Sequence, residues 1–291
     1  MDFGLVLPTV TPRATPEGIE AAAEVAVRLG WSTVWVTDHV LVHKDDPDYG
    51  FIYGALSTLA YVGGRYPSLR LGASVINVPL RNAVVLAKEL AGLDALTRGR
   101  LLVGVGLGDA DDISEYKNLG VDHLYHQRGA FLDEAIRLWR HLWSGSTEPF
   151  DGRFYQPRDY AFGPLPAQGA RVPILVGGRS PAAYRRAGAL GDGYHATRRP
   201  PAEVAEAIPH IRAAAEAAGR PMPPISVRTR VRFGPSGSAP AIAGSAADML
   251  AEVRAYQAVG VQHLAFLFDD TTPEGITTAA ERFQREVLAG L

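Results

Sequence analysis

The chain has 291 residues, of which 47% are hydrophobic and 21% are charged, a balance typical of a globular protein rather than a disordered one. Its 29 basic and 31 acidic residues leave a formal net charge of -2, so no overall basic field favours nucleic-acid binding. The absence of cysteine excludes disulfides, thiolate zinc sites, cysteine-ligated iron–sulfur clusters and a cysteine nucleophile.

The N-terminal segment lacks the pattern of a secretory signal. Asp2 stands where a signal peptide carries basic residues, and Pro8 ends the apolar run after a few positions. No stretch reaches the roughly 18 uninterrupted apolar residues that a transmembrane helix requires. We therefore expect a soluble, cytoplasmic protein that binds neither membranes nor nucleic acids.

The first part of the chain alternates short apolar runs with segments of helical periodicity. Thr15 and Pro16 are typical of a helix N-cap and first helical position, and Gly30 is typical of a helix end. This pattern predicts strands over 3–7, 33–37, 69–78 and 101–105, and helices over 16–29, 52–62 and 83–96.

Regularity lapses over 109–171, which holds one predicted helix near 129–143 and an irregular polar and aromatic stretch. The alternation then resumes, with strands predicted over 172–176, 193–197, 225–233 and 262–268, and helices over 180–190, 203–218, 245–259 and 273–288. Among the acidic residues on predicted helices, Glu24, Glu89 and Glu134 are expected on solvated faces.

About eight strand–helix units predict an α/β fold of the (β/α)8 TIM-barrel type. The alternative is a doubly wound open sheet, which would carry a glycine-rich turn after its first strand, where this chain has Pro8 to Pro12. We expect a single domain over 1–291 with residues 109–171 inserted between the fourth and fifth strands as a lid.

Two candidate clusters follow the second and third strands, at the end where barrel enzymes place their active sites. Asp38 and His39 could orient a ligand and move a proton, or could be a loop cap beside a surface histidine. The small residues Gly72, Ala73 and Ser74 could admit a flat ligand, although packing against a bulky neighbour is the favoured explanation.

Two glycine clusters follow later strands. The segment Gly104–Asp109 has GxGxG spacing, a weak phosphate signal, and places Asp109 at the pocket as a candidate acid. Gly177, Gly178 and Arg179 precede a serine cap and a proline, so that a helix N-terminus could bind phosphate there; an ordinary capped helix is the alternative. No spacing in the chain predicts a metal site.

The chain resembles the luciferase-like monooxygenase superfamily, particularly its branch that uses the deazaflavin coenzyme F420. The stretches that carry the resemblance are VWVTDHV, LRLGASVINVPLRNAVVLAKELAGLDALTRGRLLVGVGLG and PILVGGRSPAAYRRAGALGDGY. The resemblance implies a barrel that holds a flavin-like ring across the carboxyl ends of its strands, with an insertion after the fourth strand.

The resemblance also implies roles for individual residues. His39 is the expected proton-handling residue and Asp109 the second, although relatives often have Glu at the latter position. A non-proline cis peptide is implied between Ser74 and Val75. The residues expected to bind the cofactor are Asp38, Ser74, Val75, Ile76, Leu107, Gly108, Val176, Gly177, Gly178 and Arg179.

Three functions remain open from the sequence. The first is hydride transfer between F420 and a small organic substrate, which the Asp38–His39 pair favours through the resemblance. The second is a monooxygenase that uses reduced FMN and oxygen on the same fold, and the third is a non-catalytic flavin-binding protein. A homodimer is a further possibility.

Overall fold

A computed structural model describes residues 1–10, 14–46, 49–108, 113–235, 237 and 240–291. Eight parallel strands close into a barrel, because the last of them pairs with both the first and the one before it. The barrel strands, in order around the sheet, are β1 (Asp2–Val6), β2 (Thr33–Val36), β3 (Arg70–Ala73), β5 (Leu101–Gly106), β6 (Ile174–Val176), β7 (Gly193–Thr197), β8 (Ile225–Phe233) and β10 (Val261–Phe268).

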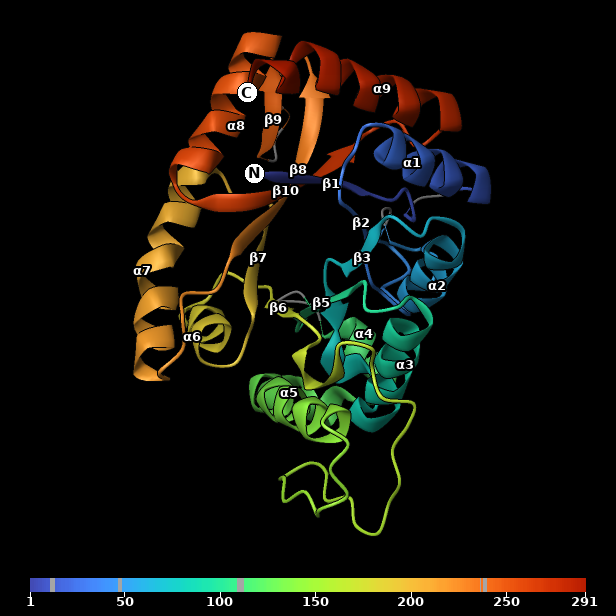
Figure 1. The fold of residues 1–291 in the computed structure, drawn as a ribbon, viewed down its shortest axis with the longest axis vertical. Helices are drawn as coiled ribbons and strands as arrows, with labels where there is room; N and C mark the ends of the chain where they lie inside the picture. Colours follow the sequence, from blue (N-terminus) through green and yellow to red (C-terminus); the bar gives the residue numbers. More distant parts are fainter. Residues whose placement is uncertain (11–13, 47–48, 109–112, 236, 238–239) are drawn as a thin grey trace.

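The helices form the outer layer around these strands (Figure 1). They are α1 (Pro16–Arg28), α2 (Ala55–Arg65), α3 (Ala83–Leu96), α4 (Ser114–Asn118), α5 (Arg128–Trp143), α6 (Pro181–Ala189), α7 (Pro201–Ala217), α8 (Ala246–Ala258) and α9 (Pro273–Glu286). The predicted α/β barrel is therefore confirmed.

Several predicted element boundaries are reproduced because local caps fix them. Thr15 accepts a hydrogen bond from the backbone of Gly18 and begins α1, and Asn82 accepts from Val84 and Val85 and begins α3. The strand predicted over 69–78 is interrupted. It divides into β3 and the short β4 (Ile76–Asn77), with a cis peptide at Ser74–Val75 between them.

One short strand, β9 (Ala241–Gly244), was not predicted and extends the sheet beside β8 outside the barrel. The insertion lies between β5 and β6, as expected. Part of it belongs to the helical layer, since Trp139 and Trp143 of α5 are buried and donate their indole N–H groups to carbonyls of Ala83 and Ala87. Its irregular part loops away from the barrel below α5 (Figure 1).

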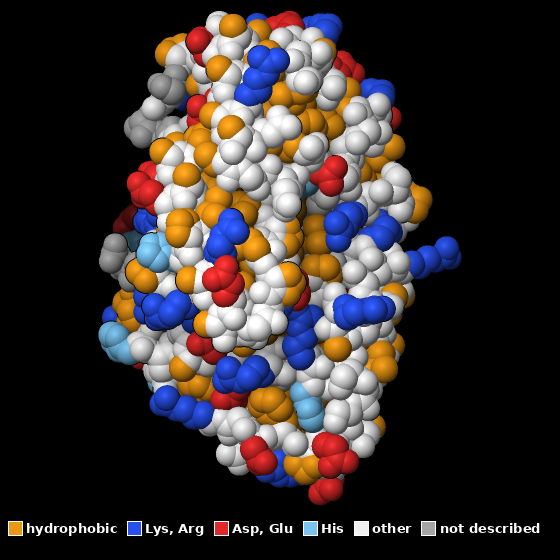
Figure 2. All heavy atoms as spheres, turned by 60° about the vertical axis from the view of Figure 1, so that its left-hand side comes forward, with side chains coloured by type: hydrophobic (Ala, Val, Ile, Leu, Met, Phe, Trp, Pro, Cys, Tyr) orange, Lys and Arg blue, Asp and Glu red, His pale blue; other side chains and the backbone are white. Residues whose placement is uncertain are grey.

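Two apolar regions form the core. The larger lies between strands and helices, and the smaller lies inside the barrel, where Val6, Trp35, Leu102, Leu175 and Ala265 meet. On the outer surface, basic and acidic side chains are scattered over the face shown in Figure 2, which agrees with the nearly balanced charge. Among the described residues, no helix combines the length and apolar character needed to cross a bilayer.

Candidate functional site

The carboxyl ends of three neighbouring strands bring several predicted site residues together. Ile76 pairs with Val105 of β5, and Val105 pairs with Val176 of β6. Gly177 continues from β6 through a backbone hydrogen bond to Val105. The candidates Ser74–Ile76 and Val176–Gly178 therefore lie at one rim of the barrel.

Val75 explains why glycines are needed at this rim. A methyl group on Gly106 would lie 2.5 Å from Cγ2 of Val75, and one on Gly177 would lie 3.0 Å from Cγ1 of Val75. Since real side chains do not approach so closely, the two glycines allow Val75 to pack flat against β5 and β6. Val75 itself is half-buried, so it presents an apolar surface at the barrel mouth.

Ser74 is fixed from inside the barrel on two sides. Its hydroxyl lies 2.7 Å from Nε2 of His195, and its carbonyl accepts a 2.8 Å hydrogen bond from Arg228. His195 in turn contacts the Ser226 hydroxyl at 2.7 Å. The segment that carries Val75 is thereby held in place by buried polar groups.

His195 is neutral in this network. Complete burial lowers its pKa well below the ordinary value, and the nearby positive charge of Arg228 and the ring of His263 lower it further. A neutral imidazole has one donor and one acceptor nitrogen, which matches its contacts with two hydroxyl groups. The network is therefore satisfied without an additional buried charge.

Trp35 fills the barrel below this network. Its indole stacks on His195 with ring centroids 4.5 Å apart and donates a 3.0 Å hydrogen bond to Nε2 of His263. Gly72 lies directly against the indole, where any side chain would collide with it. The favoured explanation of the small residues at 72–74, packing against a bulky neighbour, is thus confirmed for Gly72.

Asp38 has a buried carboxylate that binds within the protein. Arg81 donates two hydrogen bonds to it at 2.8 and 2.6 Å, and the backbone N–H of Asn77 donates a third at 3.0 Å. These contacts tie the end of β2 to β4. In this arrangement the carboxylate accepts hydrogen bonds from neighbouring protein groups. Its expected contact with a cofactor ring stays a prediction.

His39 is paired with an acidic residue of the insertion. Its Nδ1 lies 3.0 Å from a carboxylate oxygen of Glu115 on α4, and its ring packs on Tyr49 at 4.3 Å between centroids. Glu115 also accepts backbone hydrogen bonds from Val40 and Leu41. Helix α4 therefore holds the loop after β2 and orients the imidazole.

The pKa of Glu115 lies below its ordinary value. Burial raises it, but the hydrogen bonds from His39, Val40 and Leu41 and the attraction to His39 lower it by more. A carboxylate that stays ionised beside an imidazole nitrogen favours a proton on that nitrogen. Glu115 thus sets which nitrogen of His39 carries a hydrogen.

The remaining predicted residues are placed less centrally or are not described. Leu107 uses its carbonyl to accept a 2.7 Å hydrogen bond from Tyr116, and Gly108 is exposed in the left-handed region with φ 74°. Asp109 lies outside the described residues. In the described part of the chain, no group of three or more His, Asp or Glu side chains is placed to hold a metal ion.

The predicted phosphate segment begins α6. Gly178 is exposed and has φ 116°, a conformation that favours glycine. Ser180 caps the helix by accepting from the backbone N–H of Ala183, and Arg179 is exposed. The expected local geometry is present, and the binding of an anion there stays a prediction.

A sequence-family model described as luciferase-like monooxygenase matches residues 1–289. The chain belongs to the luciferase-like monooxygenase family. The resemblance noted from the sequence is thereby confirmed at the level of the family.

Curated relatives add a narrower similarity. The luciferase-like chain is 33% identical over 208 residues to an F420-dependent glucose-6-phosphate dehydrogenase of Mycolicibacterium fortuitum, covering 70% of this chain and 61% of the relative. A protein with the same name from Gordonia bronchialis is 32% identical over 210 residues, covering 70% and 60%. The chain thus matches about three fifths of the length of these relatives.

Solved structures with the same fold include enzymes with different cofactors. The F420-dependent tetrahydromethanopterin reductase of Methanopyrus kandleri is 16% identical, has a TM-score of 0.79 and covers 99% of both chains. The FMN-bound oxygenating component of 3,6-diketocamphane monooxygenase from Pseudomonas putida is 14% identical with a TM-score of 0.80, covering 100% of this chain and 99% of the other. These likenesses establish the luciferase-like fold.

The rim of the luciferase-like barrel fits a planar heterocycle by its chemistry. Such a ring needs an apolar surface on one face and polar groups at its edges. Val75 with the glycines beside it supplies the apolar surface, and His39 and Arg228 supply polar groups nearby.

Two residues of this site, Arg228 and Glu115, were not found from the sequence. Glu115 lies 76 residues from its partner His39. Arg228 belongs to an alternating arginine pattern on β8 that could have indicated it.

Proposed function

We propose that the chain is an oxidoreductase that transfers a hydride between coenzyme F420 and a small organic substrate. The observation that carries the proposal is the His39–Glu115 pair, 3.0 Å apart, on the same rim as the half-buried Val75 surface. The names of the curated relatives support the choice of F420. When bound, the deazaflavin supplies the hydride-carrying carbon.

In this proposal the protein provides position and proton transfer. His39 is the catalytic residue that exchanges a proton with a substrate oxygen, and Glu115 is the positioning residue that fixes its tautomer. The Ser74–Ile76 and Val176–Arg179 segments would contact the cofactor, together with Leu107 and Gly108. Asp109 would be the second proton-handling residue.

Asp38 has an indirect part in the same proposal. Its bonds to Arg81 and Asn77 fix the end of β2, and the next residue along the chain is His39. We further propose that residues 1–291 work as one cytoplasmic barrel domain, with 109–171 covering the substrate. A homodimer would cover apolar side chains such as Val85 and Leu96, which are 56% and 85% exposed on α3.

Titrating the purified protein with F420 and, separately, with FMN tests the cofactor. All four tryptophans are buried, so binding is followed by calorimetry as well as by tryptophan fluorescence. We expect saturable F420 binding that is at least tenfold tighter than FMN binding. Tight FMN binding without F420 binding would instead indicate the oxygen-using monooxygenase.

Turnover tests the assigned chemistry. Glucose 6-phosphate is the first substrate to try, because the relatives named above act on it according to their names. We expect His39→Asn to lower kcat by about 10²–10⁴-fold, the usual contribution of a proton-transfer residue, while F420 affinity changes little. An unchanged kcat would remove His39 from the mechanism, and F420 binding without turnover of any substrate would favour a non-catalytic binding protein.

A further inference from the structure

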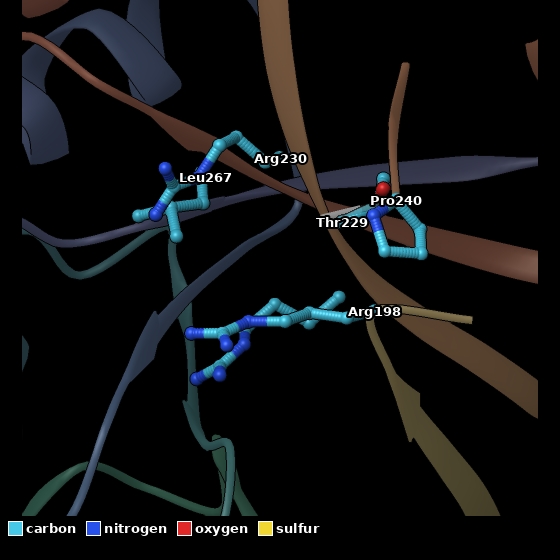
Figure 3. A pocket seen from close by; sticks show the side chains of 6 residues that line it. Arg198, Thr229, Arg230, Pro240 and Leu267 are labelled. Atoms are coloured by element: carbon cyan, nitrogen blue, oxygen red, sulfur yellow. The ribbon is translucent and has the colours of Figure 1, made fainter. Parts of the chain in front are cut away.

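A hollow beside the barrel mouth is lined largely by arginine. It is narrow, with room for little more than one water molecule, and is lined by Arg198, Arg228, Thr229, Arg230, Pro240 and Leu267. Figure 3 shows the side chains of Arg198 and Arg230 extending to the same side of β8. Three cationic side chains thus surround one small space.

The strand pattern explains how the arginines reach the same region. Ser226, Arg228, Arg230 and Arg232 occupy alternate positions on β8, so their side chains leave the same face of the strand. Ser226 and Arg228 bond to buried groups inside the barrel, whereas Arg230 is less deeply buried. Arg198 directly follows β7, the strand beside β8, and its backbone N–H donates a 2.9 Å hydrogen bond to the carbonyl of Arg228.

In the part of the chain that the structure describes, few carboxylates lie near these side chains. Among the described residues, neither Arg198 nor Arg228 has a carboxylate within ion-pair distance. Asp269 lies 3.2 Å from Arg230 and 2.7 Å from Arg232, so one carboxylate is shared by two arginines. Counted over the described residues, the group of arginines therefore has an excess positive charge.

The Arg228 side chain is buried, and no carboxylate among the described residues pairs with its charge. Burial lowers its pKa, the Tyr49 hydroxyl raises it, and the positive charges of Arg198 and Arg230 lower it. An arginine stays protonated under these conditions. Buried charges in proteins are ordinarily paired, and the described surroundings of Arg228 supply no anion.

Arg198 supplies an independent sign that the mouth has a function. It has φ 53°, a left-handed conformation that a side-chain-bearing residue adopts with difficulty. Such conformations persist where the surroundings enforce them and gather at ligand-binding sites. Within the described residues, its guanidinium donates a long hydrogen bond of 3.5 Å to the Tyr49 hydroxyl.

We propose that Arg198, Arg228 and Arg230 bind the oxyanion of the substrate, a phosphate or carboxylate group. This inference rests on the proposed function, which supplies the enzyme's substrate. It narrows the substrate class to small anionic alcohols or carbonyl compounds. Guanidinium groups match oxyanions geometrically, with parallel N–H donors. Tyr49 connects the two sites, because it contacts Arg198 on one side and packs on His39 on the other.

The proposal also predicts how the substrate lies. Its anionic end would occupy the arginine hollow, and its reacting carbon would lie toward His39. Anchoring a distant charged group in this way uses binding energy to hold the reacting carbon in place. A neutral analogue of the same shape would then lose both affinity and rate.

The test uses inorganic phosphate as the probe and the full-length protein without cofactor. Phosphate binding is measured by calorimetry for the wild type and for Arg198→Gln, Arg230→Gln, Arg179→Gln and Arg212→Gln, at two salt concentrations. Arg212 is the matched control, because it is exposed on α7 away from the hollow. Circular dichroism confirms that each variant is folded.

We expect phosphate to bind the wild type and to bind Arg198→Gln and Arg230→Gln at least tenfold more weakly, with Arg212→Gln unchanged and with affinity falling as salt rises. Undetectable binding, or equal binding by all variants, would overturn the proposal. Loss of binding in Arg179→Gln instead would place the anion at the start of α6 and would also overturn it.

A second titration separates the substrate's oxyanion from a phosphate of the cofactor. Phosphate binding is repeated with saturating F420, and we expect it to persist. Displacement of phosphate by F420 would assign the hollow to the cofactor and refute the substrate assignment. If F420 fails to bind while phosphate binding still depends on Arg198 and Arg230, the proposed function is wrong and the oxyanion site is supported.

Discussion

Gly72→Ala tests whether Trp35 is a fixed element of the barrel interior. A β carbon at position 72 would lie 2.5 Å from Cδ2 and from Cζ3 of the indole, about 1 Å inside ordinary contact distance. Trp35 has little freedom to retreat, because it stacks on His195 and donates to His263. The substitution therefore requires either a backbone shift in β3 or a displaced indole.

A shifted backbone and a displaced indole have similar costs in stability. Overpacking a close-packed interior costs about 1–3 kcal/mol, and a displaced indole leaves its buried N–H without a partner, which also costs about 1–3 kcal/mol. We expect Gly72→Ala to lower the free energy of unfolding by about 3 kcal/mol. For a domain of this size that corresponds to a fall in Tm of roughly 5–10 °C.

Urea unfolding followed by circular dichroism measures the effect, with thermal unfolding as a second measurement. The matched control is Gly92→Ala in the middle of α3, where a new β carbon has no atom within 4 Å. That substitution should leave stability unchanged or raise it by up to about 1 kcal/mol, because alanine favours helix. Equal behaviour of the two variants would refute the view that the indole is immobile.

Three further predictions concern ionisable groups. Glu115→Gln should lower kcat and move the acidic limb of the pH–rate profile to lower pH, because His39 loses the carboxylate that favours its protonation. Arg81→Met should destabilise the protein by about 3 kcal/mol, since Asp38 would become a buried carboxylate without its cation. Acidification from about pH 6.5 to 4 should remove up to about 3 kcal/mol of stability through His263 alone, because burial lowers the pKa of His263 to about 4, and the lowered pKa of His195 should add to this loss.

The sign of the last effect follows from proton uptake. Between pH 4 and 6.5 the unfolded chain binds a proton at position 263 that the folded chain does not, so acid favours unfolding. Urea midpoints measured across this range should become less pH-dependent in His263→Gln. For Arg81 the control is Arg65→Met, which breaks an exposed pair with Glu20 and should leave stability unchanged. A pH–rate profile unaltered by Glu115→Gln would show that Glu115 does not act through His39.

Local signals in the sequence were sufficient for most of the barrel. Helix α3 begins and ends where it was predicted, over 83–96, because Asn82 caps it and its apolar periodicity is unbroken. Strands β7 and β8 also match their predicted bounds. The cis peptide at Ser74–Val75 was implied by the family resemblance and is present, whereas the division of the strand there was not predicted, because the apolar run continues through Val78.

Residues whose role depends on distant partners could not be predicted in this way. Glu134 was expected on a solvated helix face, and this was wrong. It is 4% exposed and accepts backbone hydrogen bonds from Arg153, Phe154 and Tyr155 in the irregular part of the insertion. A carboxylate on a helix has the same local sequence whether water or a folded loop covers it, so only the tertiary structure distinguishes the two.

The barrel interior changes from apolar to polar toward its mouth, and this gradient connects the scaffold with the proposed chemistry. Trp35 closes the apolar part, and His195, Ser74 and Arg228 lie above it, joined by hydrogen bonds. Burying these groups costs stability that leucine or valine would not. A folding requirement alone does not account for an arginine at that depth. The need to hold Ser74 and to attract an anion accounts for this arginine, because both need a fixed positive charge that water cannot screen.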